Sequence, residues 1–475
     1  MKNKKMISIL SLVCIGLVLL IPFLNLAIMS FTDFSAYNGL LGSPFVGFAN
    51  IAEVLSKSGV TRVMKNTVVI SILSLFVGAA YIFVAFPAIG ASHNRIVKTG
   101  LTIIFALPAM IPVNTYIIIL QTILPREVLI QSSVLLQMIA AVEYGVRFSA
   151  VFVIGALFVR GNILREATKY SLLFVSLRLI NILTVDTTFM NSFYNPLTYE
   201  HLDTYGSYLH RLGFMQSDFS VAAAGYIVRL LAGLLPAVIG LFLLVMLFRE
   251  KTSLNNSSGN FGPFILFAVL PMVLLVLAVV TGTGDFFGFE LPRVRQAYIY
   301  GIVIAVVSAG VVVTLGMLLA YAIVHLGMAG VLIVAALYFV SDNLLGYYIS
   351  GRSIGMLNSI AGVVFQNMYL TAPIALIGAF IMKADYSVSR IFTVSGAAMG
   401  LAFAWFWGDH MSALVALHST DKYPISLVMY QVGNSQNAAG YSSGPGQLTA
   451  ILYILIPILA AGACIGISSF GDKQA

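Results

Sequence analysis

The sequence is poor in charged residues. Of its 475 residues, 9% are charged and 60% are apolar, and the mean hydropathy is +0.98. Soluble domains carry about 25% charged residues. Because a soluble protein with so few charges would lack a polar coat, the composition excludes a water-soluble fold. It predicts an all-α, multi-pass membrane protein.

Cysteine and nucleotide-binding motifs are also scarce. The two cysteines, Cys14 and Cys464, lie within predicted helices, so neither a disulfide framework nor a cysteine metal site is expected. No Gly-Lys dipeptide occurs, which excludes the usual phosphate-binding loop. The six histidines are scattered without metal-ligand spacing, and no hydrolytic triad is recognisable. We therefore predict no resident metal, no cofactor and no enzymatic activity for this chain alone.

Twelve apolar runs are each long enough to cross a bilayer as a helix. The runs are 6–30, 66–91, 99–124, 132–159, 169–190, 219–248, 263–281, 297–324, 329–349, 359–382, 391–417 and 447–468. The first follows "MKNKK" and lacks a small-x-small cleavage site, so we interpret it as a retained helix with its basic end inside.

Basic residues occupy alternate connections between these runs, which sets the expected topology. With the N-terminus inside, the inner segments hold Lys2, Lys4, Lys5, Arg95, Lys98, Arg160, Arg165, Lys169, Arg249, Lys251, Lys383, Arg390 and Lys473. The same segments hold far fewer acidic residues, namely Glu166, Glu250, Asp385 and Asp472. The positive-inside rule then places both termini in the cytoplasm and the chain in the cell membrane. The net charge of +8 needs no nucleic-acid partner, because these loops account for it.

A polar segment divides the chain into two six-helix halves. Residues 1–250 form the first half, 251–262 a Ser/Asn/Gly-rich cytoplasmic linker, and 263–475 the second half. An even helix count gives both halves the same orientation, as in a parallel repeat. Weak self-similarity between "RVMKNTVVISILS" (62–74) and "RQAYIYGIVIAVVS" (295–308) supports this division. Two long outer loops, 191–218 and 418–446, are either solvated caps or docking sites for an external partner.

Charged residues inside apolar runs are candidate site residues, because charge at membrane depth is costly unless it is paired or faces water. Glu143 and Arg147 lie four residues apart, on one face of a helix. They are either an internal structural pair or part of a polar path between the halves. Arg178 and Arg229 lie in the next two runs and are candidates for the same path.

The segment "FAWFWGDHM" (403–411) gathers aromatic and polar side chains at the outer end of its run. Trp405, Trp407, Asp409 and His410 are candidates for a sugar contact, because aromatic rings stack on sugar faces and carboxylates accept bonds from hydroxyls. The alternative is an interfacial aromatic belt with Asp409 at the water boundary.

Several stretches of the first half resemble the permease subunits of bacterial ABC carbohydrate importers, in the oligosaccharide branch related to maltose-type permeases. The stretches are "FTDFSAYNGLLGSPFVGFANI" (31–51), "KNT" (65–67), "LPAMIPVNTYI" (107–117), "YNPLTYEHLDTYGSYLHRLGF" (194–214) and "DFSVAAAGYIVRL" (218–230). They occur in the order of the first permease subunit of that family.

The second half is similar to the partner subunit. Its matching stretches are "LLAYAIV" (318–324), "LGYYISGRSIGMLNSIAGVV" (345–364) and "DKYPISLVMYQV" (421–432). The resemblance implies a type I importer permease with both subunits fused in one chain. It also implies an extracytoplasmic solute-binding protein and, through a separate cytoplasmic ATPase dimer, the use of ATP.

The chain departs from the family at the cytoplasmic loops that dock into the ATPase. The family pattern there is E-A-A-x-x-x-G with a downstream Leu-Pro. The first half has "RGNILREATKYSLLF" (160–174), in which Arg165, Glu166 and Ala167 are the residual coupling residues. The second half has only "KADYSVSR" (383–390), with Lys383, Asp385 and Arg390 as the residual positions. Eight residues make about two helical turns, which leaves no room for an amphipathic coupling helix with its connections.

Three functions remain open at this point. The first is a fused importer permease that forms the translocation path between its halves. The second is a permease-derived protein without ATP coupling, which acts as a sensor or as a scaffold of a cell-envelope complex. The third is a proton- or sodium-coupled carrier that uses Glu143, Arg147 and Arg178.

Overall fold

The structure is a computed structural model and consists of helices. It describes residues 2–471 except 91, 93, 118–132, 159–162, 186–187, 191–197, 251–293, 384–386 and 432–446. Within these residues there is no β-strand, and only an isolated bridge joins Thr32 to Phe45. Eight described helices are long and apolar enough to cross a membrane, or nine if one bent pair counts as a span. The chain is therefore a multi-pass α-helical membrane protein, as the composition predicts.

The long helices follow the predicted runs closely. They are α1 (Lys2–Ser30), α4 (Val60–Gly90), α5 (Arg95–Met110), α8 (Ser133–Ala150) continued by η1 (Val151–Phe158), α9 (Ile163–Ile180), α13 (Phe219–Arg249), α15 (Val294–Leu326), α16 (Met328–Ser341), α17 (Leu344–Ser353), α19 (Thr371–Met382), α20 (Val388–Gly408) and α23 (Gln447–Gly471). Shorter elements connect them: α2 (Gly39–Gly42), α3 (Ala49–Ser56), α11 (Tyr199–Leu202), α12 (Tyr205–His210), η2 (Arg211–Met215), α18 (Ile360–Gln366), η4 (Asn367–Leu370), α21 (Met411–Ala416) and η5 (Thr420–Lys422).

Three of the twelve predicted runs have no counterpart, straight or bent, among the described helices that are long and apolar enough to cross a membrane. The run 263–281 lies outside the described residues, together with the linker 251–262. The run 99–124 begins with α5, which ends at Met110, and its last seven residues also lie outside. The run 169–190 corresponds to α9, which ends at Ile180. The number twelve and the internal repeat therefore stay predictions.

The run 329–349 is bent rather than straight. Helices α16 and α17 meet at 85°, and Asp342 and Asn343 form the break between them. Asp and Asn side chains compete with helical hydrogen bonding, which favours a break at this point. The bend brings Gly346 against α1, where an added Cβ would lie 2.3 Å from the carbonyl oxygen of Pro22. Only glycine permits this close approach, so α1 holds the second arm of the bend in place.

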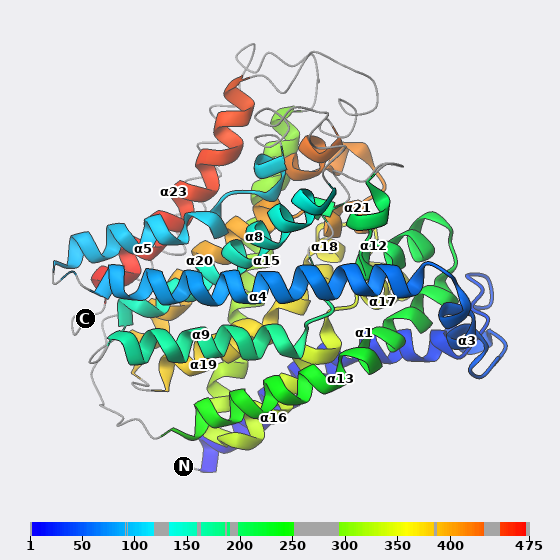
Figure 1. Ribbon diagram of the computed structural model, residues 1–475, viewed down its shortest axis with the longest axis horizontal. Helices are drawn as coiled ribbons and strands as arrows, with labels where there is room; N and C mark the ends of the chain where they lie inside the picture. Colours follow the sequence, from blue (N-terminus) through cyan, green and yellow to red (C-terminus); the bar gives the residue numbers. More distant parts are fainter. Residues whose placement is uncertain are drawn as a thin grey trace.

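Both chain termini lie at one end of the bundle, on the left in Figure 1. We call this the terminal end and the opposite one the distal end. Helices α4, α9 and α13 lie side by side in Figure 1, and α9 packs against both of the others. In the second part of the chain α15 packs against α19 and α20, and α20 packs against α23. At the last of these contacts Gly400 meets the backbone of Ala461, as expected for small residues between membrane helices.

The distal end is tied to α4 by the "KNT" segment. The Asn66 amide donates to the carbonyl oxygen of Asp203 at 3.0 Å, and the Thr67 hydroxyl accepts from the Tyr205 N–H at 2.8 Å. The Asp203 carboxylate in turn receives two bonds from Arg211, at 3.0 and 2.7 Å. These contacts fix α12, which carries His210 toward the centre of the molecule.

The outer surface of α13 is a stripe of apolar side chains. Leu231, Leu235 and Phe242 are 63%, 72% and 62% exposed and recur on one helical face. Monomeric soluble proteins rarely expose continuous apolar surface of this kind. The stripe is therefore a lipid-facing surface, and the bilayer is the solvent around this helix.

Candidate functional site

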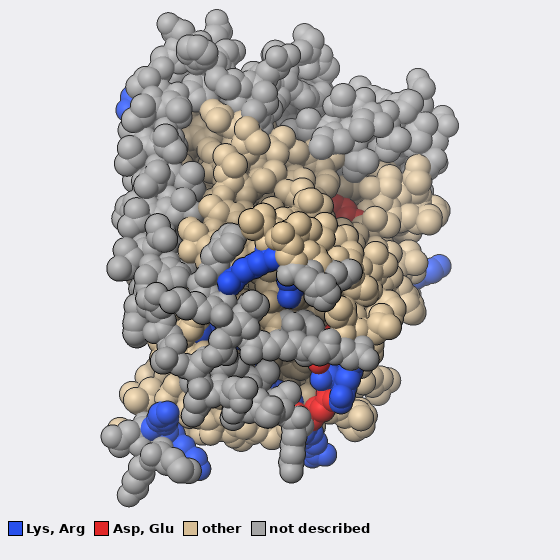
Figure 2. Space-filling model, turned by 90° about the vertical axis from the view of Figure 1, so that its left-hand side faces the viewer, with Lys and Arg blue, Asp and Glu red and all other residues tan. Residues whose placement is uncertain are grey.

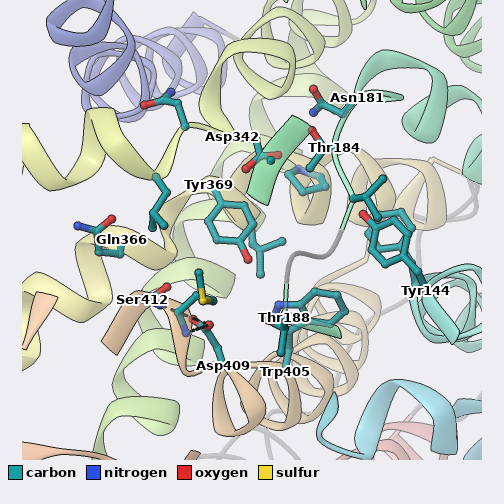
Figure 3. A pocket seen from close by; sticks show the side chains of 18 of the residues that line it. Tyr144, Asn181, Thr184, Thr188, Asp342, Gln366, Tyr369, Trp405, Asp409 and Ser412 are labelled. Carbon is teal, nitrogen blue, oxygen red and sulfur yellow. Dashed lines mark hydrogen bonds between the residues drawn. The ribbon is translucent and has the colours of Figure 1, made fainter. Parts of the chain in front are cut away.

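A cavity of about 210 Å³ lies inside the helical bundle. Its walls come from both predicted halves: α8, α9 and α13 supply one side, and the α16–α17 bend, η4, α20 and α21 supply the other. Figure 3 shows Tyr369 in the middle of this lining, between Asp342, Gln366, Asp409 and Tyr144. The cavity is thus a shared feature of the two halves.

The Glu143–Arg147 pair predicted from spacing is formed. The Arg147 Nε lies 2.7 Å from the Glu143 carboxylate, and both side chains are buried. The Arg147 guanidinium also lies over the Trp405 ring, 4.6 Å from its centroid, and lines the cavity. The pair is therefore internal and borders the polar interior, so the two sequence interpretations are compatible.

Arg229 holds the bend between α16 and α17. Its Nη2 donates to the carbonyl oxygen of Asp342, and its Nη1 lies 3.9 Å from the Asp342 carboxylate. The guanidinium also lies over the Tyr226 ring, 4.9 Å from the centroid. Arg229 thus connects α13 to the broken helix and keeps Asp342 at the cavity wall.

Arg178 is buried at the cavity wall near the end of α9 and is 2% exposed. Its Nη1 donates to the Tyr144 hydroxyl at 2.9 Å and to the Thr184 carbonyl oxygen at 3.2 Å. Its Nη2 donates to the Ser74 hydroxyl at 3.4 Å, and the guanidinium lies 4.5 Å from the Tyr144 ring centroid. All of these partners are neutral.

The four residues of the "FAWFWGDHM" cluster separate in the structure. Trp405 and Asp409 line the cavity. Trp407 is 1% exposed and donates its ring N–H to the Tyr453 carbonyl oxygen at 2.9 Å in the core. His410 is fully buried and stacks on Tyr430 at 3.9 Å between centroids. Two residues along a helix correspond to about 200° of rotation, so the two tryptophans point to nearly opposite sides.

Several buried polar atoms at the cavity wall have no hydrogen-bond partner within the described part of the chain. Both amide atoms of Gln366, the Tyr347 hydroxyl, the Asn343 Oδ1 and the His210 Nε2 are in this state. Gln366 is 1% exposed, so water at the protein surface does not reach it. Buried polar atoms are normally hydrogen-bonded, so a polar ligand or water in the cavity is a candidate partner for these atoms.

Sequence reasoning missed Gln366, Asn343, Tyr347 and Asp342. The signal available was the occurrence of Asp, Asn and Gln inside the apolar runs 329–349 and 359–382. Neutral amides and tyrosines attract less attention than charges in an apolar run, although they too need partners at membrane depth. Their convergence on one cavity depends on helix packing and is not visible in the sequence.

A second, apolar cavity of about 90 Å³ lies on the terminal side of the first. Its α20 lining, from Val394 to Ala402, precedes Trp405 and is nearer the end where α20 begins. The two cavities share a wall formed by Phe148, Leu370, Pro373 and Trp405. Together they trace a line from the polar centre toward the terminal end, interrupted by these side chains.

Arg165 and Glu166, predicted as residual coupling residues, belong to an ion-pair cluster at the terminal end. Glu250 pairs with Arg165 and, at 3.3 Å, with Lys169, which also contacts Glu166 at 2.9 Å. Slight burial raises the pKa of Glu250, but the bonds and charges of Lys169 and Arg165 outweigh it, so the pKa is lowered. Ala167 is buried in α9. Figure 2 faces this end and shows Lys and Arg side chains with a few acidic ones among them.

Two of the positions predicted as residual coupling residues in the second half, Lys383 and Arg390, contact the interior of the bundle. Lys383 donates to the Leu247 carbonyl oxygen at 2.9 Å. Burial lowers the pKa of Lys383, and the nearby Glu250 carboxylate opposes this shift only in part. Arg390 is 3% exposed and lies over the Phe158 ring at 4.5 Å. Asp385 lies outside the described residues. Helix α19 ends at Met382 and α20 begins at Val388, so only five residues separate them.

No metal-binding arrangement of three or more His, Cys, Asp or Glu side chains occurs within the described ranges. No model of a known protein family matches this chain, and no curated protein sequence matches it. The cavity and its lining are therefore the features of the protein that indicate a function.

Proposed function

We propose that the chain is the membrane-spanning permease subunit of a carbohydrate importer of the ABC type and that the central cavity is its solute site. The observation that carries the proposal is the set of unpartnered buried polar atoms beside Trp405 and Tyr369. Sugar hydroxyls both donate and accept hydrogen bonds, so they satisfy amide, hydroxyl and imidazole groups alike. The aromatic rings supply flat apolar surface for the sugar face.

The size of the cavity limits what it holds at one time. Pockets for drug-sized ligands have volumes of roughly 300–1,000 Å³. A cavity of about 210 Å³ is smaller and suits a single sugar unit. An oligosaccharide would then occupy the site one unit at a time as it moves along the path.

The packing pattern supports two parallel repeats with the solute path between them. Helix α4 packs on α8 and α9, and α9 packs on α13; in the same order α15 packs on α19 and α20, and α20 packs on α23. The cross-contacts are reciprocal as well. Helix α5 packs against α23, and α16 packs against α13, so the third helix of each half meets the last helix of the other. Such reciprocity is the pattern that a two-fold axis along the membrane normal produces.

The short connections at the terminal end favour a second candidate, a permease-derived sensor or envelope scaffold without ATP coupling. Five residues between α19 and α20 leave no room for a coupling helix. Coupling through an ATPase dimer requires a rigid element that transmits its movement. If an ATPase does bind, the cluster of Arg165, Glu166, Lys169 and Glu250 is the surface we expect it to contact. The third candidate, an ion-coupled carrier, gains no specific support, because Glu143 is engaged with Arg147.

The experiment that tests the proposal is sugar binding and uptake by the intact protein. Purified protein in lipid nanodiscs is titrated with mono- and oligosaccharides, and membranes are assayed for uptake of the sugars that bind. We expect the wild-type protein to bind at least one of these sugars and the Gln366→Leu variant to bind none. Absence of sugar binding and uptake would contradict the carbohydrate proposal.

A second measurement separates the two leading candidates. The protein is isolated from its native membrane under mild conditions and assayed for bound ATPase and for sugar-stimulated ATP hydrolysis. An ATPase that co-purifies and responds to sugar supports the importer. Sugar binding without either result favours the sensor or scaffold.

A further inference from the structure

Arg178 differs from the other arginines of the cavity in its charge balance. Arg147 has the Glu143 carboxylate at 2.7 Å, and Arg229 has Asp342 at 3.9 Å. Arg178 forms no ion pair with any carboxylate within the part of the chain that the structure describes. It is nevertheless 2% exposed and lies in the wall of a membrane-embedded cavity. A buried charge without a counter-charge is unfavourable, which points to an anion that binds beside it.

The donors of Arg178 show what kind of anion fits. A guanidinium has five N–H donors, and three of those in Arg178 bind Tyr144, Thr184 and Ser74. The Nε–H and one Nη2–H take no part in these three bonds. Two N–H donors of one guanidinium match the two oxygens of a carboxylate, and this geometry is the strong one for arginine.

The acidic residue on the other wall does not require a cationic ligand. Asp409 accepts hydrogen bonds from the backbone N–H groups of Met411 at 3.0 Å and Ser412 at 3.4 Å. These backbone donors are hydrogen-bond partners for the Asp409 carboxylate. The other acidic residue of the lining, Asp342, lies 3.9 Å from Arg229, whereas Arg178 has no carboxylate partner among the described residues. This asymmetry favours an anionic solute over a zwitterion.

We infer that the Arg178 corner of the cavity binds the carboxylate of an acidic sugar, so that the solute class is a uronic-acid carbohydrate. The inference depends on the proposed function, because the remaining groups of the cavity, Gln366, Tyr369 and Trp405, bind the sugar ring and its hydroxyls. The carboxylate replaces the counter-charge that Arg178 lacks. A neutral sugar fills the same cavity and leaves the guanidinium unpaired.

The test uses matched pairs of neutral and acidic sugars. Purified full-length protein in lipid nanodiscs is titrated calorimetrically with glucose and glucuronate, galactose and galacturonate, and mannose and mannuronate. We expect at least one uronate to bind about 30-fold more tightly than its neutral partner, within the range of a charged hydrogen-bonded contact. Hexose 6-phosphates are titrated as a second class of anionic sugar. Tighter binding of a hexose 6-phosphate than of the uronates would overturn the assignment to a carboxylate.

Variants separate binding by Arg178 from a purely structural role. In Arg178→Gln we expect uronate affinity to fall to the level of the neutral sugar, while the affinity for the neutral sugar changes less than about threefold. Arg178→Lys retains the charge but not the paired donors, so we expect an intermediate loss of uronate affinity. If the Gln variant does not fold, the Lys variant provides the test in its place. Arg165→Gln, which removes an arginine at the terminal end, should leave the preference unchanged.

The outcomes distinguish this inference from the proposed function. Equal affinity for uronate and hexose in the wild type would overturn the inference and leave the carbohydrate proposal standing. Binding of acetate as strong as that of uronates, with no neutral sugar bound, would overturn the carbohydrate proposal. If no sugar and no anion binds, both fail.

Discussion

Trp405 faces the cavity and Trp407 faces the core, although a single residue separates them. Both were equal candidates for a sugar contact in the sequence. The structure assigns them different environments: Trp405 contacts Arg147 at the wall of the central cavity, and Trp407 packs among Tyr298, Phe403 and Tyr453. Substitution of each residue therefore tests a different property.

We expect Trp405→Ala to lower sugar affinity about tenfold with little change in the unfolding temperature, since it removes one stacking surface from the cavity. Trp407→Ala is expected to destabilise the fold by about 3–5 kcal/mol, because it leaves a large hole in the core. Calorimetric titration and thermal unfolding measure the two effects. An equal loss of stability in both variants would show that Trp405 is also structural.

Gln366 offers a complementary test, because its buried amide has no hydrogen-bond partner among the residues that the structure describes. Replacement by leucine removes a desolvated polar group of similar size, so we expect the unfolding temperature of the sugar-free protein to stay constant or rise. Sugar binding should be lost in the same variant. A fall in stability would mean that the amide has a structural partner, and retained binding would exclude it from the site.

His210 is expected to make the stability of the protein depend on pH. Burial, with a contribution from the charge of Arg211, lowers its pKa to about 4. An unfolded histidine has a pKa of about 6.5, so between these values the unfolded state binds more protons than the folded state. Stability is therefore complete above about pH 6.5 and falls by up to about 3 kcal/mol as the pH decreases toward 4. His210→Gln should reduce this dependence in thermal unfolding measured across the range, with a remainder from the buried His410, and an unchanged slope would assign the effect to another group.

At the scale of elements, the bend between α16 and α17 organises the site. It places Asp342 and Asn343 at the cavity wall, and the run 329–349 was expected to be one straight helix. The Asp-Asn pair in an otherwise apolar run is the local signal for the break. The angle itself depends on Arg229 and on the contact between Gly346 and Pro22, which join segments far apart in the sequence.

We expect Gly346→Ala to disturb the bend, because the new Cβ would overlap both the Asn343 side chain and the Pro22 carbonyl oxygen. The unfolding temperature and sugar affinity should both decrease, since α17 must move away from α1. Gly351→Ala is the matched control on the same helix, where the nearest atom to an added Cβ is a Phe365 ring carbon at 3.7 Å. Equal behaviour of the two variants in thermal unfolding would contradict the role of this contact.

At the scale of the whole molecule, the sequence was sufficient for the class of fold and for some candidate residues. Composition and long apolar runs predicted a helical membrane protein, because the bilayer requires them. The cost of charge at membrane depth singled out Arg147, Arg178 and Arg229, and all three line the cavity. The neutral part of the lining was not predictable, since Gln366 and Tyr347 are ordinary residues until packing brings them together.

The short connection between α19 and α20 was also visible in the sequence, and the structure shortens it to five residues. The sequence did not show that the basic residues at the two ends of this connection, Lys383 and Arg390, contact other helices of the bundle. Lys383 caps the last turn of α13, and Arg390 is buried beside Phe158. These two residues therefore join the connection between α19 and α20 to α13 and to η1.

The wall shared by the two cavities has an electrical consequence. Phe148, Leu370, Pro373 and Trp405 separate a polar chamber from an apolar one. An ion that moves through a membrane carrying 100 mV changes its energy by about 2.3 kcal/mol per charge, so any continuous water path would dissipate the potential. A constriction of apolar side chains excludes ions because water does not wet it. If the two cavities lie on a solute path, as the proposed function requires, these four residues are its barrier to ions, and we expect Trp405→Gly to produce a leak of small ions.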